Sequence, residues 1–173
     1  NVIGTYRNPR ATYLGGLRIA ISANVIFVAY YTGLLGVDVT HPDSMKQMSF
    51  FPTGGYANNL TVRNTLAFVA SGLAGLWIID VSDSQHPRPV SNIMTGGFVS
   101  DLVISDSLAY LVNSYSYVPN DSSLGLWIIS ISDSSHPRIV SHHQGILTHA
   151  IGGVFSTIAG EKNRILITQP SSS

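Results

Sequence analysis

Histidines and carboxylates are the residues of this chain best suited to metal binding or acid–base chemistry. The chain of 173 residues holds six histidines and nine Asp or Glu residues, and it has no cysteine. His41, His86 and His136 each precede a proline. A metal site needs three or four ligands that converge on one ion. These histidines stand about one repeat apart, as described below, so we interpret them as turn residues.

A second group of histidines comprises His142, His143 and His149. Neighbouring residues of a strand point to opposite faces, which argues against His142 and His143 sharing one ion. No carboxylate stands close to them in the sequence, so a further ligand for zinc or another divalent metal is missing. Such a site remains the alternative here, and the prediction is that the chain binds no metal.

Catalytic chemistry has no clear signature in the sequence. Asp38 and Asp80 lack the spacing of a calcium loop and belong to separate repeats. Serines are plentiful, but no Gly-x-Ser-x-Gly, Gly-x-Gly-x-x-Gly or P-loop word occurs. Without cysteine there is no thiol nucleophile or thiolate site. We therefore predict no catalytic residues, no cofactor and no enzymatic activity.

Short apolar segments recur along the chain and organise it. Gly75-Leu-Trp-Ile-Ile-Asp80 returns as Gly125-Leu-Trp-Ile-Ile-Ser130, and a weaker copy begins at Gly33, 42 residues before Gly75. The step from Gly75 to Gly125 is 50 residues, with a polar insertion around 115–123. A period near 42 residues is typical of a four-stranded propeller blade.

Four apolar runs in the second copy predict four strands, at 58–63, 66–70, 76–81 and 88–93. In the third run, Leu76 and Ile78 would lie on one face, with Trp77 and Ile79 on the other, so both faces are apolar. Radially stacked blades cover both faces of each sheet. We accordingly interpret Trp77 and Trp127 as core residues, the alternative being sugar-stacking platforms.

The ends of the chain resemble parts of blades. Residues 2–6 look like an outermost strand, and two further pairs of strands are expected at 17–22 and 25–30, and at 149–157 and 164–168. Gly-Gly pairs at 15–16, 54–55, 96–97 and 152–153 precede each innermost strand.

We therefore predict an all-β propeller of about three full blades plus one composite or partial blade. Residues 1–168 would form a single propeller domain or propeller segment, and 169–173 a polar tail. Either a small four-bladed ring closes with a defect, or the chain is a segment of a larger ring completed by another copy or by further sequence. We favour the second, because an open blade interface exposes apolar edges. The first residue, Asn1, fits a processed form or a fragment.

Charge is sparse and balanced. Nine Lys or Arg offset nine Asp or Glu, and charged residues make up 10% of the chain, against about 25% in soluble domains. Such a chain has no field to attract nucleic acid or an anionic membrane, and no run is long enough to span a bilayer. Weak, balanced charge promotes association. The predicted partners are other protein chains, by self-association or through neighbouring domains, without nucleic acid or membrane insertion.

The second copy resembles the LVIVD repeat. The likeness rests on Ala67–Ala70, Gly75–Asp83, Pro87 and Val90. The third copy departs from the pattern at Ser130, and the first has Met45-Lys-Gln-Met48 in place of the Pro-x-x-Val segment. The resemblance implies a β-propeller at the bacterial or archaeal cell surface, with no generally assigned catalytic residues.

The main functional prediction is a non-enzymatic, extracellular or cell-surface module for self-assembly, adhesion or protein–protein interaction. The alternative is a sugar or divalent-metal site, or an enzyme site, at the mouth of the central channel, formed by Tyr56, Phe98, Asp101 and the Gly-Gly loops. The competing interpretation is that these residues close the ring by packing. Asn59 and Asn120 each begin a glycosylation acceptor word, and Asn120 in the insertion is the better candidate.

Overall fold

The computed structural model describes residues 18–115, 121–144, 157–161 and 164–168, which contain fourteen β-strands and no helix. The first sheet holds β1 (Arg18–Ser22), β2 (Val25–Tyr30), β3 (Gly33–Asp38) and β4 (Lys46–Pro52). The second holds β5 (Asn59–Arg63), β6 (Leu66–Ala70), β7 (Leu76–Asp80) and β8 (Arg88–Ile93). The third holds β9 (Phe98–Ser105), β10 (Leu108–Tyr115), β11 (Gly125–Ser130) and β12 (Arg138–His143). A two-stranded sheet follows, with β13 (Thr157–Glu161) and β14 (Arg164–Thr168).

These elements confirm the all-β class and most of the strands predicted from the sequence. Each four-stranded sheet is antiparallel and keeps its strands in chain order. One prediction is wrong: the strand paired with β14 is Thr157–Glu161, not residues 149–157. Only Thr157 of that expected range is among the described residues, and the predicted strand at 2–6 lies outside them. Glu161 pairs with Arg164, so the strand opposite β14 is the segment next to it in the sequence, and the apolar run before Thr157 led the prediction to the wrong residues.

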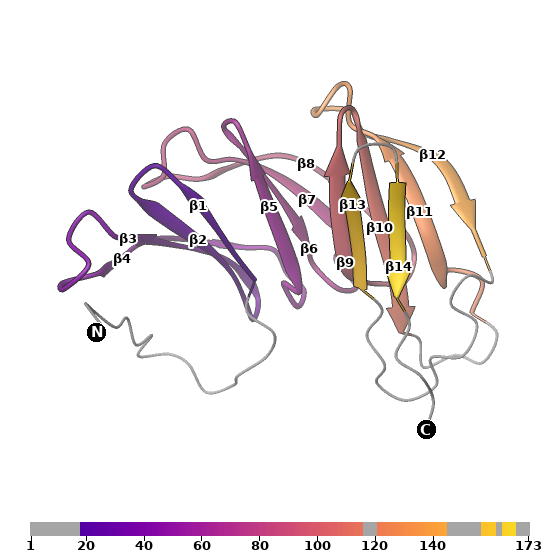
Figure 1. The fold of residues 1–173 in the computed structure, drawn as a ribbon, viewed down its shortest axis with the longest axis horizontal. Coiled ribbons are helices and arrows are strands. Elements are labelled where there is room, and N and C mark those ends of the chain that lie inside the picture. Colours follow the sequence, from indigo (N-terminus) through magenta and orange to yellow (C-terminus); the bar gives the residue numbers. More distant parts are fainter. Residues whose placement is uncertain (1–17, 116–120, 145–156, 162–163, 169–173) are drawn as a thin grey trace.

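The sheets stand beside one another as propeller-like blades (Figure 1). Their first strands are neighbours: β1 lies beside β5, β5 beside β9, and β9 beside β13. Sheets related in this way present broad apolar faces to each other and need no helix to cover them.

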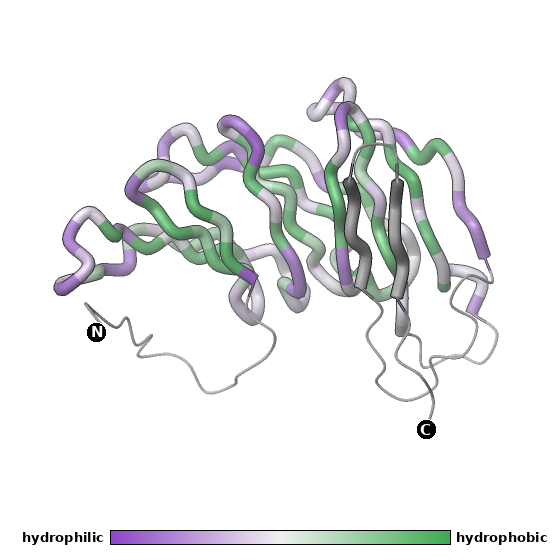
Figure 2. Tube along the Cα trace, viewed as in Figure 1, coloured by the Kyte–Doolittle hydropathy of each residue, from purple (hydrophilic) through white to green (hydrophobic). Residues whose placement is uncertain are grey.

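Each pair of four-stranded sheets encloses an apolar core. The core between the first and second sheets includes Phe27, Leu34, Leu60, Val69 and Ile79. The core between the second and third includes Phe68, Leu76, Ile78, Leu102, Leu111 and Ile129. Figure 2 shows hydrophobic stretches on the strands of all three sheets. Full burial of one such side chain contributes about 1.5–3 kcal/mol, so stacking stabilises the sheets jointly.

Both tryptophans are partly buried at these interfaces. Trp77 lies edge-on to Phe51 of the preceding sheet, with ring centroids 5.6 Å apart. Trp127 packs against the second core, and its Nε1 donates a hydrogen bond to the Ser123 carbonyl at 2.8 Å. The core interpretation of both residues is therefore confirmed.

The cross-strand registers show which residues of the three sheets are equivalent. One row crosses the first sheet as Ile19, Val28, Leu35 and Phe50. The same row crosses the second sheet as Leu60, Val69, Trp77 and Asn92. In the third sheet it is Leu102, Leu111, Trp127 and His142. We call these the backward rows, because in the second and third sheets they face the preceding sheet.

The glycines that begin the repeated Gly-Leu segments are needed for a steric reason. A Cβ atom on Gly75 would collide with the Ile93 carbonyl of the adjacent strand, and one on Gly125 with the His143 carbonyl. Both glycines also have positive φ, +77° and +128°, where a side chain is strained. Glycine therefore lets strands three and four of a blade approach each other closely.

Candidate functional site

Asp83 and His86 bond to each other in the turn after β7. His86 Nδ1 donates to Asp83 Oδ2 at 2.9 Å, and Gln85 N–H donates to Asp83 Oδ1 at 3.0 Å. Asp133 and His136 repeat the contact after β11, also at 2.9 Å. The histidine hydrogen bond lowers the pKa of each aspartate, because it stabilises the carboxylate. These side chains therefore form hydrogen bonds within their own turns, as the sequence predicted for the histidines.

Asp38 and Asp80 have a similar local role at the end of the third strand. Asp38 Oδ1 accepts hydrogen bonds from the Thr40 hydroxyl at 2.6 Å and the Thr40 N–H at 2.8 Å. Asp80 Oδ1 accepts one from Ser82 N–H at 2.9 Å. These bonds lower the pKa of both carboxyl groups. Each carboxylate is committed to its own turn, so the pair forms no shared acid–base site.

The predicted channel-mouth residues divide into a buried part and an exposed part. Asp101 is 4% exposed, and its carboxylate accepts hydrogen bonds from Asn59 Nδ2 and from Leu102 N–H. Asn59 belongs to β5 and Asp101 to β9. Asp101 therefore joins two neighbouring sheets beneath the surface, which favours the packing interpretation of this residue.

The exposed part is a short aromatic group. Tyr56 is 53% exposed, and its ring centroid lies 6.5 Å from that of Phe98 and 5.3 Å from that of Tyr31. Phe98 also packs closely on Gly72, which exchanges two backbone hydrogen bonds with Val99. Tyr31 was not identified from the sequence. Its only signal was an aromatic residue in the turn between strands two and three.

A buried polar pair marks each junction between four-stranded sheets. Asn113 Nδ2 donates hydrogen bonds to Thr95 Oγ1 and to the Ser123 carbonyl, both at 2.9 Å. At the equivalent place one blade earlier, the Ser71 hydroxyl donates to Thr53 Oγ1. The sequence analysis missed these pairs. Their signal was the threonine that precedes the Gly-Gly pair in both copies.

His142 lies beside Trp127, which packs against the core between the second and third sheets. Its ring stacks on Trp127, with centroids 4.0 Å apart and an interplanar angle of 15°, and its Nε2 lies 3.0 Å from the Leu124 carbonyl. His143 pairs with Leu126 and takes the opposite face, as predicted, while His149 lies outside the described residues. In the part of the chain that the structure describes, no group of three His, Asp or Glu side chains is placed to hold a metal.

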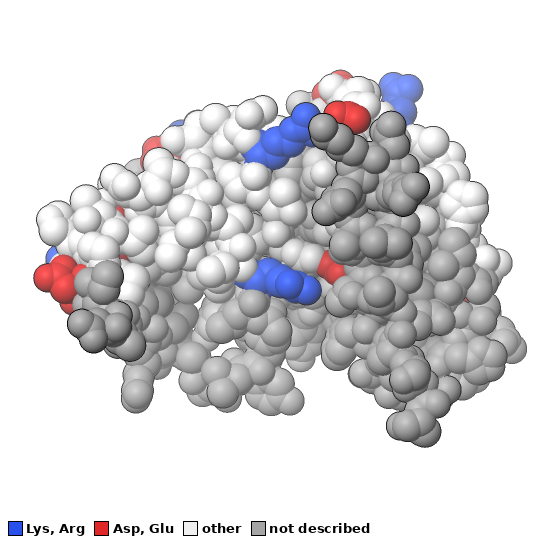
Figure 3. Space-filling model, viewed as in Figure 1, with Lys and Arg blue, Asp and Glu red and all other residues white. Residues whose placement is uncertain are grey.

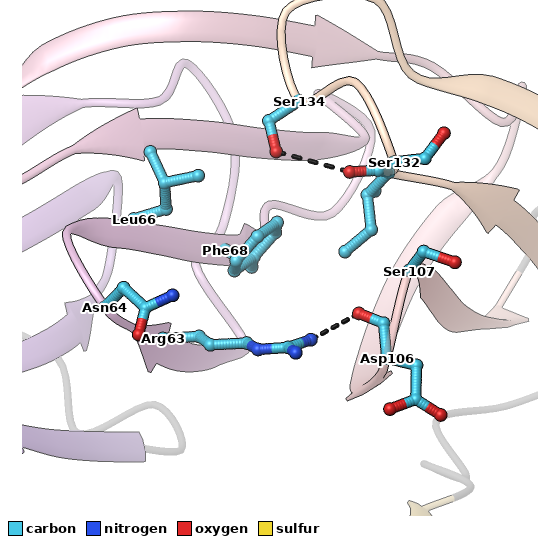
Figure 4. A pocket seen from close by; sticks show the side chains of 9 residues that line it. Arg63, Asn64, Leu66, Phe68, Asp106, Ser107, Ser132 and Ser134 are labelled. Atoms are coloured by element: carbon cyan, nitrogen blue, oxygen red, sulfur yellow. Dashed lines mark hydrogen bonds between the residues drawn. The ribbon is translucent and has the colours of Figure 1, made fainter.

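A cleft of about 390 Å³ opens between the second and third sheets (Figure 4). It is lined by Arg63, Asn64, Leu66, Phe68, Asp106, Ser107, Ile131, Ser132 and Ser134. Arg63 Nη1 donates to the Asp106 carbonyl, which ties the first turns of the two sheets together. No histidine is among the lining residues, so its serines have no imidazole base beside them. Most of the residues that line the cleft are polar, and they do not include the base that a serine nucleophile needs.

Two other sequence predictions concern the surface. Asn59, one glycosylation candidate, is half-buried and bonded to Asp101, which makes it a poor acceptor. Asn120 lies outside the described residues. Few charged side chains appear on the face drawn in Figure 3. Across the described residues, no helix has the length and hydropathy to cross a bilayer.

Together these features define an all-β protein of stacked, propeller-like blades whose polar residues mainly bond turns and joints. Comparison with solved structures finds the same architecture. The computationally designed Ika4 protein aligns with a TM-score of 0.64 and 7% identity, over 93% of this chain and 95% of that one. The N-terminal domain of Nup159 aligns with a TM-score of 0.55 and 7% identity, over 91% of this chain and 40% of that one. At these identities the likeness concerns the fold alone.

A family model assigns the chain more specifically. The LVIVD repeat matches residues 54–95 and 96–144, which contain the second and third sheets. The chain belongs to the LVIVD repeat family, as its sequence suggested. No curated protein matches the chain. The designed Ika8 protein aligns with a TM-score of 0.63 and 9% identity over 87% of this chain, which spans 42% of that structure's length.

Proposed function

We propose that this chain is a non-enzymatic β-propeller module of the cell exterior that acts by self-assembly, adhesion or binding to other protein chains. The observation that supports this best is the unfinished stack. In the described residues the last sheet has two strands, whereas the three before it have four. Blades with two apolar faces need a neighbour on each side, so we expect further protein to complete the stack.

The chemistry of the described side chains is consistent with this role. The aspartates that follow the third strands bond their own turns, and Asp101 bonds across a sheet junction. The location outside the cell rests on the LVIVD resemblance. The self-association rests on the apolar stack and the balanced charge of nine basic and nine acidic residues.

We include ring closure in this proposal. The composite fourth blade would contain β13 and β14, with residues 2–6 as its outermost strand. Such a blade still lacks one strand, and a second copy or further sequence would supply it.

Light scattering over a wide concentration range tests the proposal, with electron microscopy of the assembled species. We expect oligomers, seen as rings or filaments of repeated chains, with inter-chain contacts above roughly 1,000 Å². A chain that stays monomeric at every concentration would contradict self-association.

A second candidate function is ligand binding at the aromatic group. It is favoured by one observation, that Tyr31, Tyr56 and Phe98 lie together at the end of the blades with the two tyrosines exposed. Aromatic rings of this kind stack on sugars and other flat apolar surfaces. A thermal-shift screen of sugars and divalent metal ions tests it. A ligand that raises the Tm of the parent and not of Tyr56→Ala would support binding here.

A further inference from the structure

The first strand of the first sheet is apolar and exposed on a face where the equivalent residues of the later sheets are buried. Ile19 is 60% exposed and Ile21 is 68% exposed. The register places Ile19 in the backward row at the position of Leu60 and Leu102, which are 5% and 2% exposed. The same position of the repeat thus changes from core to surface at the first strand of the first sheet.

The exposed part of this face lies at its two edges, because Leu35 and Val37 of β3, on the same side, are each 3% exposed. Ile21 pairs with Ile26, and Ile19 with Val28, so the isoleucines of β1 continue into an apolar β2. Phe50 ends the backward row at 39% exposure, where the later sheets have Asn92 and His142. None of these five residues is charged. We call Ile19, Ile21, Ile26, Val28 and Phe50 the open face.

The two internal junctions show what kind of surface covers such a face. The backward side of the second sheet is covered by Phe27, Ala29 and Leu34 of the first sheet. The backward side of the third sheet is covered by Phe68, Ala70, Leu76 and Ile78 of the second. In both cases the apolar cover is the opposite side of a neighbouring blade.

We propose that the open face docks the β13–β14 end of a second copy of this chain, in a head-to-tail contact that continues the blade stack. This inference rests on the proposed self-association and specifies its surface and partner. The last sheet of the second copy already stacks as a blade within its own chain, with β13 beside β9. Because the chain has equal numbers of basic and acidic residues, its net charge causes no repulsion between copies.

The arrangement of the chain favours a second copy over closure within one chain. The first sheet and β13–β14 stand apart in Figure 1, with β5 and the rest of the second sheet between them. The open face is the side of the first sheet that is turned away from the second. A contact between two different surfaces is heterologous, and it generates a ring when the rotation closes or a filament when it does not.

The test compares the full chain with Ile21→Glu by light scattering across concentrations. The matched control is Leu73→Glu, because Leu73 is also 68% exposed but lies in the turn between β6 and β7. We expect Ile21→Glu to lose assembly and Leu73→Glu to keep it, with unchanged circular dichroism in both. Assembly that persists in Ile21→Glu overturns this inference and leaves the proposed function intact, whereas a monomeric parent overturns both.

A mixing experiment distinguishes head-to-tail contact from two open faces packed on each other. Tagged Ile21→Glu keeps its β13–β14 end, so it should still bind the open face of the parent and be captured as a mixed complex. Absence of mixed complexes overturns the head-to-tail contact.

A cysteine substitution tests whether Ile21 becomes covered on assembly without adding a charge. Ile21→Cys introduces a single thiol, because the chain has no cysteine. Its maleimide labelling should slow on assembly, while that of Leu73→Cys should not, and equal labelling of the two overturns the proposal.

Discussion

Asn59 and Asp101 stand 42 residues apart at the same place in neighbouring sheets, and the Asn59 amide donates a hydrogen bond to the Asp101 carboxylate. Equivalent residues meet here because β5 and β9 are adjacent first strands. His86 and His136 are equivalent too, but each bonds the aspartate of its own turn. Position along the blade radius therefore decides whether a repeated polar residue acts across blades or within one.

The Asn59–Asp101 contact predicts a stability effect at a residue that the sequence offered as a ligand site. Asp101→Ala should lower the free energy of unfolding by about 1–3 kcal/mol, because the buried Leu102 N–H and the half-buried Asn59 amide lose their acceptor. Asp101→Asn keeps one acceptor oxygen and should cost less. Urea unfolding of the two variants measures this difference. If Asp101→Ala is as stable as the parent, the hydrogen bonds of Asp101 do not stabilise the fold, and Asp101 becomes a candidate ligand group again.

The backward rows predict opposite results for two aliphatic residues at equivalent positions. Leu60→Ala should cost about 2–5 kcal/mol, because it leaves a cavity between the first and second sheets. Ile19→Ala should change the stability of the monomer by less than about 0.5 kcal/mol, as an exposed substitution does. Denaturant unfolding at low protein concentration makes the comparison. Equal losses would mean that the open face is covered within a single chain.

Gly75 predicts a steric effect that can be separated from backbone strain. Gly75→Ala should destabilise the chain by about 1–3 kcal/mol or more, because the new methyl group meets the Ile93 carbonyl. Gly54 is the matched control, since its φ is +75° but a Cβ atom there has nothing within 4 Å. In thermal unfolding, the Tm of Gly75→Ala should lie well below the Tm of Gly54→Ala. Similar Tm values for both would show that φ alone decides the cost.

The turn aspartates predict how stability depends on acid. The pKa values of Asp83 and Asp133 lie below the ordinary 3.8, so the unfolded chain binds protons more readily than the folded one. Their contribution is complete above pH 3.8 and is lost as the pH falls through the lowered values. Asp83→Asn with Asp133→Asn should flatten this acid loss in urea midpoints measured between about pH 2 and pH 6. An unchanged slope would show that these turns do not contribute.

Local patterns in the sequence were enough to predict several strands residue for residue. The runs at 25–30, 66–70, 88–93 and 164–168 are the strands β2, β6, β8 and β14. Each combines apolar or β-branched residues with turn residues at its ends, and both signals act within a few positions. The strand opposite β14 was misplaced, because the apolar run before Thr157 was taken for it, although Arg164 of β14 pairs with Glu161 just before it in the sequence.

The candidate sites were less predictable, because they depend on contacts between residues far apart in the sequence. The sequence singled out Tyr56, Phe98 and Asp101 as one group, but the fold buries Asp101 at a sheet junction and leaves Tyr56 exposed. It also brings in Tyr31 from another blade. Burial and cross-blade contact depend on how strands lie around one another, and no spacing along the chain contains that information.

By itself, the sequence determined the repeat, because similar segments recur along the chain, and the strands and turns within a blade, because these depend on neighbours within about ten positions. The tertiary structure decided which equivalent residues are core and which are surface, because burial depends on whether another sheet stands beside a residue. Leu60 and Ile19 show this most directly, at 5% and 60% exposure in the same row.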